Sequence, residues 1–250
     1  MRYYKLTIAY DGTDYQGWQA QKDVPTITNE LQNTFKRVFK KNVSIIGASR
    51  TDAGVHALGQ IARIKTNLDI PEEKILAAWN QSLPNEISIK SLELTNEQFH
   101  PIKNVKEKTY YYHFFLDRPL PFMQRYGYYH RWDIDLDKLK KNLNIFVGTH
   151  DFRSFSTGPV IKTSIRTINE INLEYFKEIN IYRITIKGKS FLHHMIRRIV
   201  GACFEIASIK NNLDENYLHQ ILQEKNPNQA LPNAPAKGLV LYEIIYNKSV

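Results

Sequence analysis

A glycine-flanked turn carries an arginine, an aspartate and a histidine within the stretch GASRTDAGVHALGQ, residues 47–60. Aspartate and glycine are ordinary turn residues, so Asp52 could serve only to accept hydrogen bonds from neighbouring amides while Gly54 supplies a positive φ. The alternative is a carboxylate in a cleft, kept ionised by a nearby cation, as a nucleophile or a base requires. Arg50 or a distant arginine could supply that cation.

Aromatic side chains crowd residues 108–115, KTYYYHFF. Side chains alternate between the two faces of a strand, which would group Tyr110 with Tyr112 and Phe114 on one face, and Tyr111 with His113 and Phe115 on the other. One of these faces should lie in the core. An exposed ring near positive charge would instead suit stacking on nucleic-acid bases, and Lys106 and Lys108 would supply that charge.

A broad apolar stripe at helical spacing marks residues 193–209, HHMIRRIVGACFEIASI, as a helix that packs inward. Arg197 and Arg198 fall on opposite sides of that stripe, so the periodicity does not decide which of them faces a site. His193 and His194 would point in different directions on a helix. We therefore expect histidines that form hydrogen bonds, not ligands of a shared metal.

Acidic residues occupy every second position of DIDLD, residues 133–137. In an extended chain Asp133, Asp135 and Asp137 would share a face and could hold a divalent metal, as in a metal-dependent nuclease. The helical pattern that follows favours another interpretation, because the helix dipole stabilises carboxylates in a first turn. We expect no metal site at these residues.

Alternating strand and helix patterns must position these side chains. In the first part of the chain the patterns predict strands at 3–12, 42–49, 56–66 and 86–95, and helices at 26–41 and from Asp69 through Trp79. The alternation restarts after residue 105, with strands at 108–116, 167–176, 181–188 and 238–247, and helices at 135–148 and 193–209. We predict an α+β protein of two domains, residues 1–105 and 106–250, with a cleft between them.

Composition limits the class of protein. The chain of 250 residues has 34 lysines and arginines against 25 acidic residues, and this net charge of +9 favours polyanions such as nucleic acids. One cysteine, Cys203, excludes an internal disulfide and any zinc site with two thiolates. No apolar run approaches the roughly 20 residues of a membrane span. The first residues lack a signal-peptide pattern, so we expect a cytoplasmic protein with no membrane segment.

Five segments, in this order along the chain, together resemble the TruA-type tRNA pseudouridine synthases, the tRNA pseudouridine synthase A family. They are SRTDAGVHALGQ at 49–60, KTYYYHFF at 108–115, GTHDFRSFS at 148–156, FLHHMIRRIVG at 191–201 and APAKGLVLYEIIY at 234–246. RTDAGVHA is a highly specific signature, and the likeness extends from end to end. Ser49 departs from the pattern, because many members have glycine there, and this affects only the local turn geometry.

The resemblance implies a role for each candidate site residue. Asp52 would be the catalytic aspartate, and Tyr110 would stack on the target base. Arg197, and not Arg198, would be the partner of Asp52, and Arg50 would help to extrude the target nucleotide and hold the RNA. Whether Asp52 attacks as a covalent nucleophile or removes a sugar proton as a base stays open.

The resemblance also implies a fold, a reaction and partners. The fold would be two RRM-like, ferredoxin-like α+β domains whose antiparallel sheets join across a central basic cleft. The reaction would convert uridine to pseudouridine at positions 38–40, in the anticodon stem-loop of tRNA, on a base flipped out of its stack. The enzyme would act as a homodimer that contacts one tRNA with both subunits, with no cofactor and no metal.

Two other classes of function remain as alternatives. A non-catalytic RNA-binding protein would keep its function when Asp52 is neutralised. A metal-dependent nuclease would use the three aspartates of residues 133–137 and would lose activity on chelation. A base deaminase does not fit, because its zinc site needs a second nearby cysteine.

Overall fold

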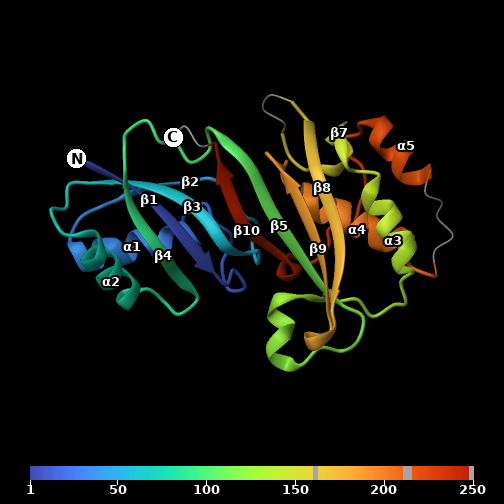
Figure 1. The fold of residues 1–250 in the computed structure, drawn as a ribbon, viewed down its shortest axis with the longest axis horizontal. Coiled ribbons are helices and arrows are strands. Elements are labelled where there is room, and N and C mark those ends of the chain that lie inside the picture. Colours follow the sequence, from blue (N-terminus) through green and yellow to red (C-terminus); the bar gives the residue numbers. More distant parts are fainter. Residues whose placement is uncertain (160–162, 211–215, 248–250) are drawn as a thin grey trace. The chain divides into compact units, whose positions relative to one another are not determined.

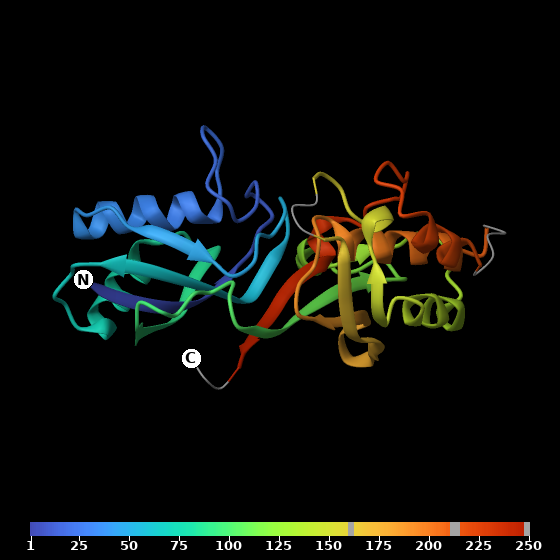
Figure 2. The same cartoon turned by 90° about the horizontal axis from the view of Figure 1, so that it is seen from above.

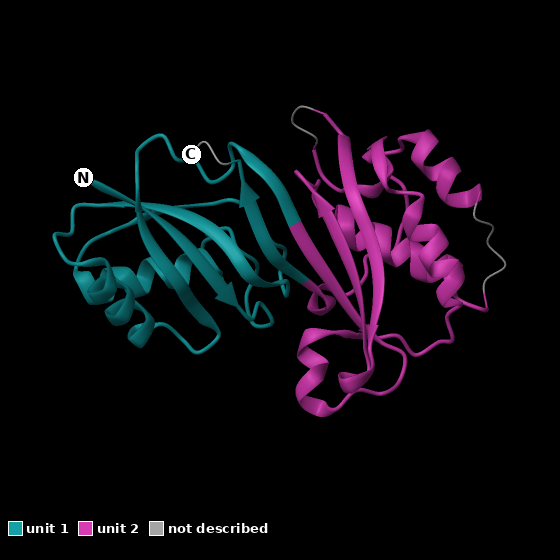
Figure 3. Ribbon diagram, in the orientation of Figure 1, with its two compact units in different colours: residues 1–108, 240–250 teal, residues 109–239 magenta. Residues whose placement is uncertain are grey.

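The computed structural model describes residues 1–159, 163–210 and 216–247. It is a mixed α/β structure with a large, mostly antiparallel sheet, and it divides into two compact units (Figure 3). The first unit contains Met1–Lys108 together with Val240–Val250, and the second contains Thr109–Leu239. This division differs from the predicted domains, which assigned everything after residue 105 to the second.

Among the described residues, five strands build the sheet of the first unit, and they can be followed in Figure 1. They are β1 (Arg2–Tyr10), β2 (Ser44–Gly47), β3 (His56–Thr66), β4 (Ile87–Thr95) and β10 (Leu239–Tyr246). The order is β4-β1-β3-β10, with β2 paired to β3. Strand β10 runs parallel to β3, with Val240 opposite His56 and Leu241 opposite Ala57. These backbone hydrogen bonds are the physical reason why residues from 240 onward belong to the first unit.

The core of the first unit lies between its sheet and two helices, α1 (Ile27–Phe39) and α2 (Glu72–Ser82). Alternate residues of β1 are buried, as the sequence pattern predicts. Helix α1 runs along the sheet (Figure 2), and Thr26 caps it by accepting a hydrogen bond from the Asn29 amide at 3.2 Å. The two helices meet at Trp79, whose indole N–H donates to the carbonyl of Leu31 at 3.2 Å. The Trp79 ring also packs edge-on against Phe35, with ring centroids 4.8 Å apart.

In the second unit, strand β5 (Val105–Phe115) enters from the first and begins the order β5-β9-β8-β7. The predicted pair of strands is confirmed as the antiparallel pair of β8 (Ile165–Phe176) and β9 (Ile181–Gly188). Two short strands were not predicted. They are β6 (Tyr128–Tyr129), which pairs with β5, and β7 (Gly148–Asp151), which pairs with β8.

Three α-helices accompany this sheet: α3 (Leu136–Asn144), α4 (Met195–Ala207) and α5 (Asn216–Glu224). The first two were predicted, each a few residues longer than observed, and α5 was not. Helix α4 is the core helix of the unit, with Ile199, Val200 and Cys203 fully buried. Burial raises the pKa of the Cys203 thiol well above its usual range. Among the described residues, no helix is both long and apolar enough to cross a membrane.

Two of the three aspartates of residues 133–137, Asp135 and Asp137, lie at the start of α3. Asp135 is the N-cap of α3, and its carboxylate accepts a hydrogen bond from the amide of Lys138 at 2.9 Å. Asp137 lies in the first turn, where the dipole favours negative charge. The helix-capping interpretation is therefore confirmed for both residues, and Asp137, as part of the helix, does not continue the extended backbone of Asp135.

The contacts of Trp79 predict a large stability cost for its removal. Trp79→Ala should lower the free energy of unfolding by about 3–5 kcal/mol, because it empties a fully buried site and removes the hydrogen bond from the indole to the Leu31 carbonyl. Urea denaturation followed by circular dichroism measures the change. Leu94→Ala is the matched control, since this side chain is 62% exposed, and it should change the stability by less than about 0.5 kcal/mol. Equal effects of the two substitutions would contradict this account.

Candidate active site

Asp52 opens a tight turn between β2 and β3. The amide of Val55 donates to the Asp52 carbonyl at 3.2 Å, and Gly54 takes a φ of +75°, as the third position of a type II turn requires. The expected positive φ at Gly54 is therefore confirmed. The Asp52 side chain is half-buried, and Arg50 is exposed beside it.

Main-chain hydrogen bonds tie this turn to the segment that follows β1. The Trp18 amide donates to the Thr51 carbonyl at 3.1 Å, and the Gly54 amide donates to the Tyr15 carbonyl at 3.2 Å. The Thr51 hydroxyl shares a 2.8 Å hydrogen bond with the hydroxyl of Tyr10, the last residue of β1. The residues on both sides of Asp52 are thus fixed to the same neighbouring segment.

The side chain of Gln60 fixes the entry to the turn. Its amide oxygen accepts a hydrogen bond from the Ser49 amide at 3.2 Å, and its amide nitrogen donates to the Ser49 carbonyl at 2.6 Å. Gln60 is fully buried, so this pairing replaces the hydrogen bonds that water would otherwise supply. Only the backbone of Ser49 takes part, so the pairing does not depend on whether serine or glycine stands there.

Lys108 binds the segment just before the turn from inside the protein. This corrects the prediction that its charge is exposed. The sequence placed its charge at the surface, beside an RNA-binding ring, but the residue is 9% exposed and its ammonium donates to the Ala48 carbonyl at 2.8 Å. Burial lowers the pKa of Lys108 to about 8. Lys106 lies on the same face of the strand, two residues earlier, and is exposed, so the core under this face begins only at Lys108.

Tyr110 lies in the second unit, on the buried face of β5. Tyr112 and Phe114 share that face and are fully buried, which confirms that one face of this strand belongs to the core. Tyr110 is 6% exposed, and its ring meets Phe191 edge-on with ring centroids 5.3 Å apart. The opposite face carries Tyr111, whose ring centroid lies 4.4 Å from the guanidinium carbon of Arg183.

His193 and His194 lie before α4 and not on it, so the expectation that they diverge is wrong. His194 is the N-cap residue and has a φ of +60°, and this left-handed backbone brings the two rings face to face with centroids 3.8 Å apart. The Thr157 hydroxyl lies 2.8 Å from Nδ1 of His193 and 2.9 Å from Nδ1 of His194. The expectation that both histidines form hydrogen bonds is confirmed.

Arg197 and Arg198 differ sharply in their surroundings. Arg198 is 4% exposed, and its guanidinium donates to the carbonyls of Ser156, at 3.0 Å, and of Gln229. Burial lowers the pKa of Arg198. Arg197 is only half-buried. Its Nε donates to the Ala234 carbonyl at 2.8 Å, and its own carbonyl accepts from the Ala234 amide at 2.9 Å.

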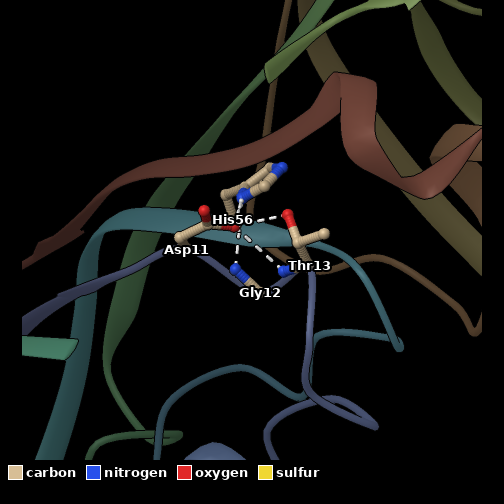
Figure 4. A network of polar contacts seen from close by, with 4 residues as sticks. All are labelled: Asp11, Gly12, Thr13 and His56. Carbon is tan, nitrogen blue, oxygen red and sulfur yellow. Dashed lines mark hydrogen bonds and ion pairs between the residues drawn. The ribbon is translucent and has the colours of Figure 1, made fainter. Parts of the chain in front are cut away.

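Several supporting contacts escaped the sequence analysis. Gln60 and Thr157 were not singled out, and Lys108 was named only for its charge; each bonds another segment, and no local pattern predicts such a partner. His56 was visible in the motif, directly after the turn. It is 3% exposed, and its Nδ1 lies 3.1 Å from a carboxylate oxygen of Asp11 (Figure 4). Its position within the specific motif, at the start of a predicted strand, is the signal in the sequence that could have drawn attention to it.

Comparison with known proteins identifies the family. The sequence profile described as tRNA pseudouridine synthase matches residues 6–102 and 143–247. The tRNA pseudouridine synthase A of Acetivibrio thermocellus is 39% identical over 248 residues, which cover 98% of this chain and 100% of that protein. The protein of the same name from Thermodesulfovibrio yellowstonii is 34% identical over 252 residues, which cover 97% and 98%. The chain therefore belongs to the tRNA pseudouridine synthase family.

Membership of this family defines the general activity. The chain is an isomerase that makes pseudouridine in tRNA, so it binds RNA and takes part in tRNA processing. A solved structure of an H/ACA RNP bound to a substrate RNA containing 2'-deoxyuridine aligns with 80% of this chain and 43% of its own chain. That alignment has 8% sequence identity and a TM-score of 0.35, which is too low to support an argument.

The buried lysine predicts a pH-dependent contribution to stability. The pKa of Lys108 is about 8 in the folded chain, against an ordinary 10.5, so between these values the unfolded chain holds a proton that the folded chain has released. The free energy of unfolding therefore rises with pH across this window, by at most about 1.4 kcal/mol per pH unit. In urea denaturation, wild type should gain stability over Lys108→Met from pH 8 to pH 10.

Lys106→Met is the control for this pH dependence, because the same change is made at an exposed position of the same strand. The difference in the free energy of unfolding between Lys106→Met and wild type should not change with pH. A constant difference for Lys108→Met as well would mean that Lys108 does not titrate in this window.

Proposed function

We propose that this chain converts uridine to pseudouridine at positions 38–40, in the anticodon stem-loop of tRNA, with Asp52 as the catalytic carboxylate. The observation that carries the proposal is the fixation of the Asp52 turn. A single carboxylate stands in a turn whose backbone is bonded at Ser49, Thr51 and Gly54. A turn needed only for its shape would not require support at so many points, whereas a reacting group depends on its exact placement.

The order of the elements supports two RRM-like, ferredoxin-like domains. In the first unit β1, α1, β2, β3, α2 and β4 follow one another in the β-α-β-β-α-β order of that fold, and the strand order is β4-β1-β3 with β2 on the far side of β3. In the second unit β5, α3, β8, β9 and α4 follow one another in the same order, with the strands as β5-β9-β8. We propose that these two sheets enclose a basic cleft for the RNA.

The reaction moves one bond on a captive base. The bond between the sugar and a ring nitrogen breaks, the uracil turns, and a bond from the sugar to a ring carbon replaces it. That carbon loses a proton and the ring nitrogen gains one, so no electrons are gained or lost and no redox cofactor is needed. Asp52 serves either by attacking covalently or by removing a sugar proton, and both routes need its ionised form.

The remaining site residues act on the nucleotide and on Asp52. Arg50 is exposed on the turn itself, a position that suits contact with the RNA backbone and extrusion of the target nucleotide. Tyr110 stacks on the flipped base. Arg197 is the proposed partner of Asp52, and its bonds to Ala234 support this role because they orient the guanidinium. Arg198 suits the role less, because its guanidinium is buried on the Ser156 and Gln229 carbonyls.

The partners and the location follow from the family resemblance. We propose that the protein acts in the cytoplasm as a homodimer, with one tRNA in contact with both subunits. It works without a metal or a cofactor. The net charge of +9 supports binding to the tRNA backbone.

Neutralising Asp52 tests the catalytic proposal. Asp52→Asn keeps the size of the side chain and its capacity to accept a hydrogen bond in the turn, but removes the negative charge. Pseudouridine formation in unmodified tRNA should fall below detection. Affinity for tRNA should stay within about tenfold, roughly 1.4 kcal/mol, because phosphate contacts and stacking carry the binding.

The matched control is Asp23→Asn, which makes the same change in charge at an exposed position of the first unit. Product mapping, a gel shift and a melting curve are run on the same preparations. Near wild-type activity in a folded Asp52→Asn variant would refute the proposed mechanism and leave the family assignment in place.

The two neighbouring arginines should separate catalysis from stability. Arg197→Ala should abolish most activity with little change in melting temperature. Arg198→Ala should lower the melting temperature, because the carbonyls of Ser156 and Gln229 lose a buried donor. Activity is compared per folded molecule. An equal or greater loss in Arg198→Ala would overturn the assignment of Arg197.

A further inference from the structure

His56 links two turns of the first unit (Figure 4). It is the first residue of β3, directly after the turn that Asp52 opens, and it is 3% exposed. Its Nδ1 lies 3.1 Å from the amide nitrogen of Gly12 and 3.1 Å from a carboxylate oxygen of Asp11. The same Asp11 oxygen accepts hydrogen bonds from the amide and the hydroxyl of Thr13, at 3.0 and 2.6 Å.

The imidazole can bond this turn in either of two ways. A nitrogen that carries a proton donates, and one that carries a lone pair accepts, so Nδ1 cannot do both at once. With a proton on Nδ1, His56 donates to Asp11. Without that proton, it accepts from the buried amide of Gly12. In both forms the side chain ties residues 11–13 to the start of β3.

These contacts close a ring around the Asp52 turn. His56 bonds Gly12, and the Gly12 carbonyl accepts from the Tyr15 amide at 3.0 Å. The Tyr15 carbonyl in turn accepts from the Gly54 amide at 3.2 Å. Gly54 leads through Val55 back to His56 along the chain. Within this ring, the imidazole of His56 supplies the one link that comes from a side chain, so it is the link that a substitution can change.

Close packing means that a movement of residues 11–13 also moves the Asp52 turn. A Cβ atom on Gly12 would lie only 2.0 Å from the Val55 carbonyl oxygen, so the two turns touch through their backbones and only glycine fits. Val55 also donates to the Asp52 carbonyl at 3.2 Å. A shift of residues 11–13 must therefore move the turn that carries Asp52.

We propose that His56 is a positioning residue for Asp52, acting through hydrogen bonds to Gly12 and Asp11. This inference rests on the proposed role of Asp52 as the catalytic carboxylate. His56 itself does not touch the uridine. Its removal should therefore slow the chemical step and leave tRNA binding unchanged, because the phosphate contacts that dominate binding are made elsewhere.

Two substitutions of similar polarity test this role. The amide of asparagine branches where Nδ1 of histidine lies, so His56→Asn can still donate to Asp11 or accept from Gly12. The amide of glutamine is one bond further out and misses both partners. His56→Gln should lower kcat about tenfold or more, His56→Asn should keep most of the wild-type kcat, and KM for tRNA should be unchanged in both. Equal losses in the two variants, or a rise in KM in place of the fall in kcat, would overturn the proposal.

Amide hydrogen exchange tests the ring without any reaction. His56→Gln should speed exchange at the Tyr15 and Gly54 amides, while the amide of Glu30, which donates to the Thr26 carbonyl at the start of α1 at 3.0 Å, serves as the internal reference. Faster exchange at Glu30 as well, or general unfolding of the variant, would make His56 a plain core residue and contradict the proposal.

The two proposals can fail separately. If Asp52→Asn stays active while His56→Gln loosens Tyr15 and Gly54, the catalytic role of Asp52 fails and His56 still holds the turn. If Asp52→Asn is inactive while exchange at Tyr15 and Gly54 is unchanged in His56→Gln, Asp52 remains the catalytic carboxylate and the role of His56 is refuted.

Discussion

The hydrogen bonds between residues 49–54 and the segment after β1 are the constraint on which the rest of the site depends. A turn at the end of two strands has considerable conformational entropy unless its backbone is bonded. Here Thr51 and Gly54 are bonded to Trp18 and Tyr15, and the Thr51 hydroxyl to Tyr10. Main-chain groups make most of these contacts, so the path of the chain, more than the choice of side chains, sets where the Asp52 carboxylate stands.

Burial separates residues that the sequence makes look alike. Arg197 and Arg198 are neighbours of identical chemistry, but the rotation of about 100° between successive helical residues puts Arg198 among carbonyl groups in the interior. A buried cation without such acceptors would be very costly. Through these two hydrogen bonds, Arg198 joins the segments around residues 156 and 229. Lys106 and Lys108 also differ, although they share a face of β5: Lys106 lies where that face is exposed, and Lys108 lies where it is buried.

Much of the fold could be predicted because its signals are local. The alternation of β1, the apolar stripe of α4 and the paired patterns of β8 and β9 each depend on residues close together in the sequence. The location of β10 could not be predicted in this way, since its partner β3 lies far away along the chain. The same holds for Lys108, whose acceptor Ala48 is 60 residues distant.

The sequence predicted some features of the candidate site and misplaced others. The specific motif around Asp52 pointed to that residue, and Gly54 adopts the expected backbone conformation. The histidines before α4 were misjudged because the helix pattern was extended over them. A left-handed backbone at His194 is rare for a residue other than glycine, and periodicity gives no warning of it.

The parallel pairing of β10 with β3 has a consequence for the order in which the protein is made. Translation delivers β10 after every element of the second unit, yet Val240 pairs with His56, the residue that follows the Asp52 turn. A nascent chain that has emerged only as far as β4 already contains Asp52, but this flank of its sheet is still an open edge. The sheet of the first unit is thus completed only when the ribosome has also released the residues that make up the second unit, so a partial chain would carry the Asp52 turn beside an unfinished sheet.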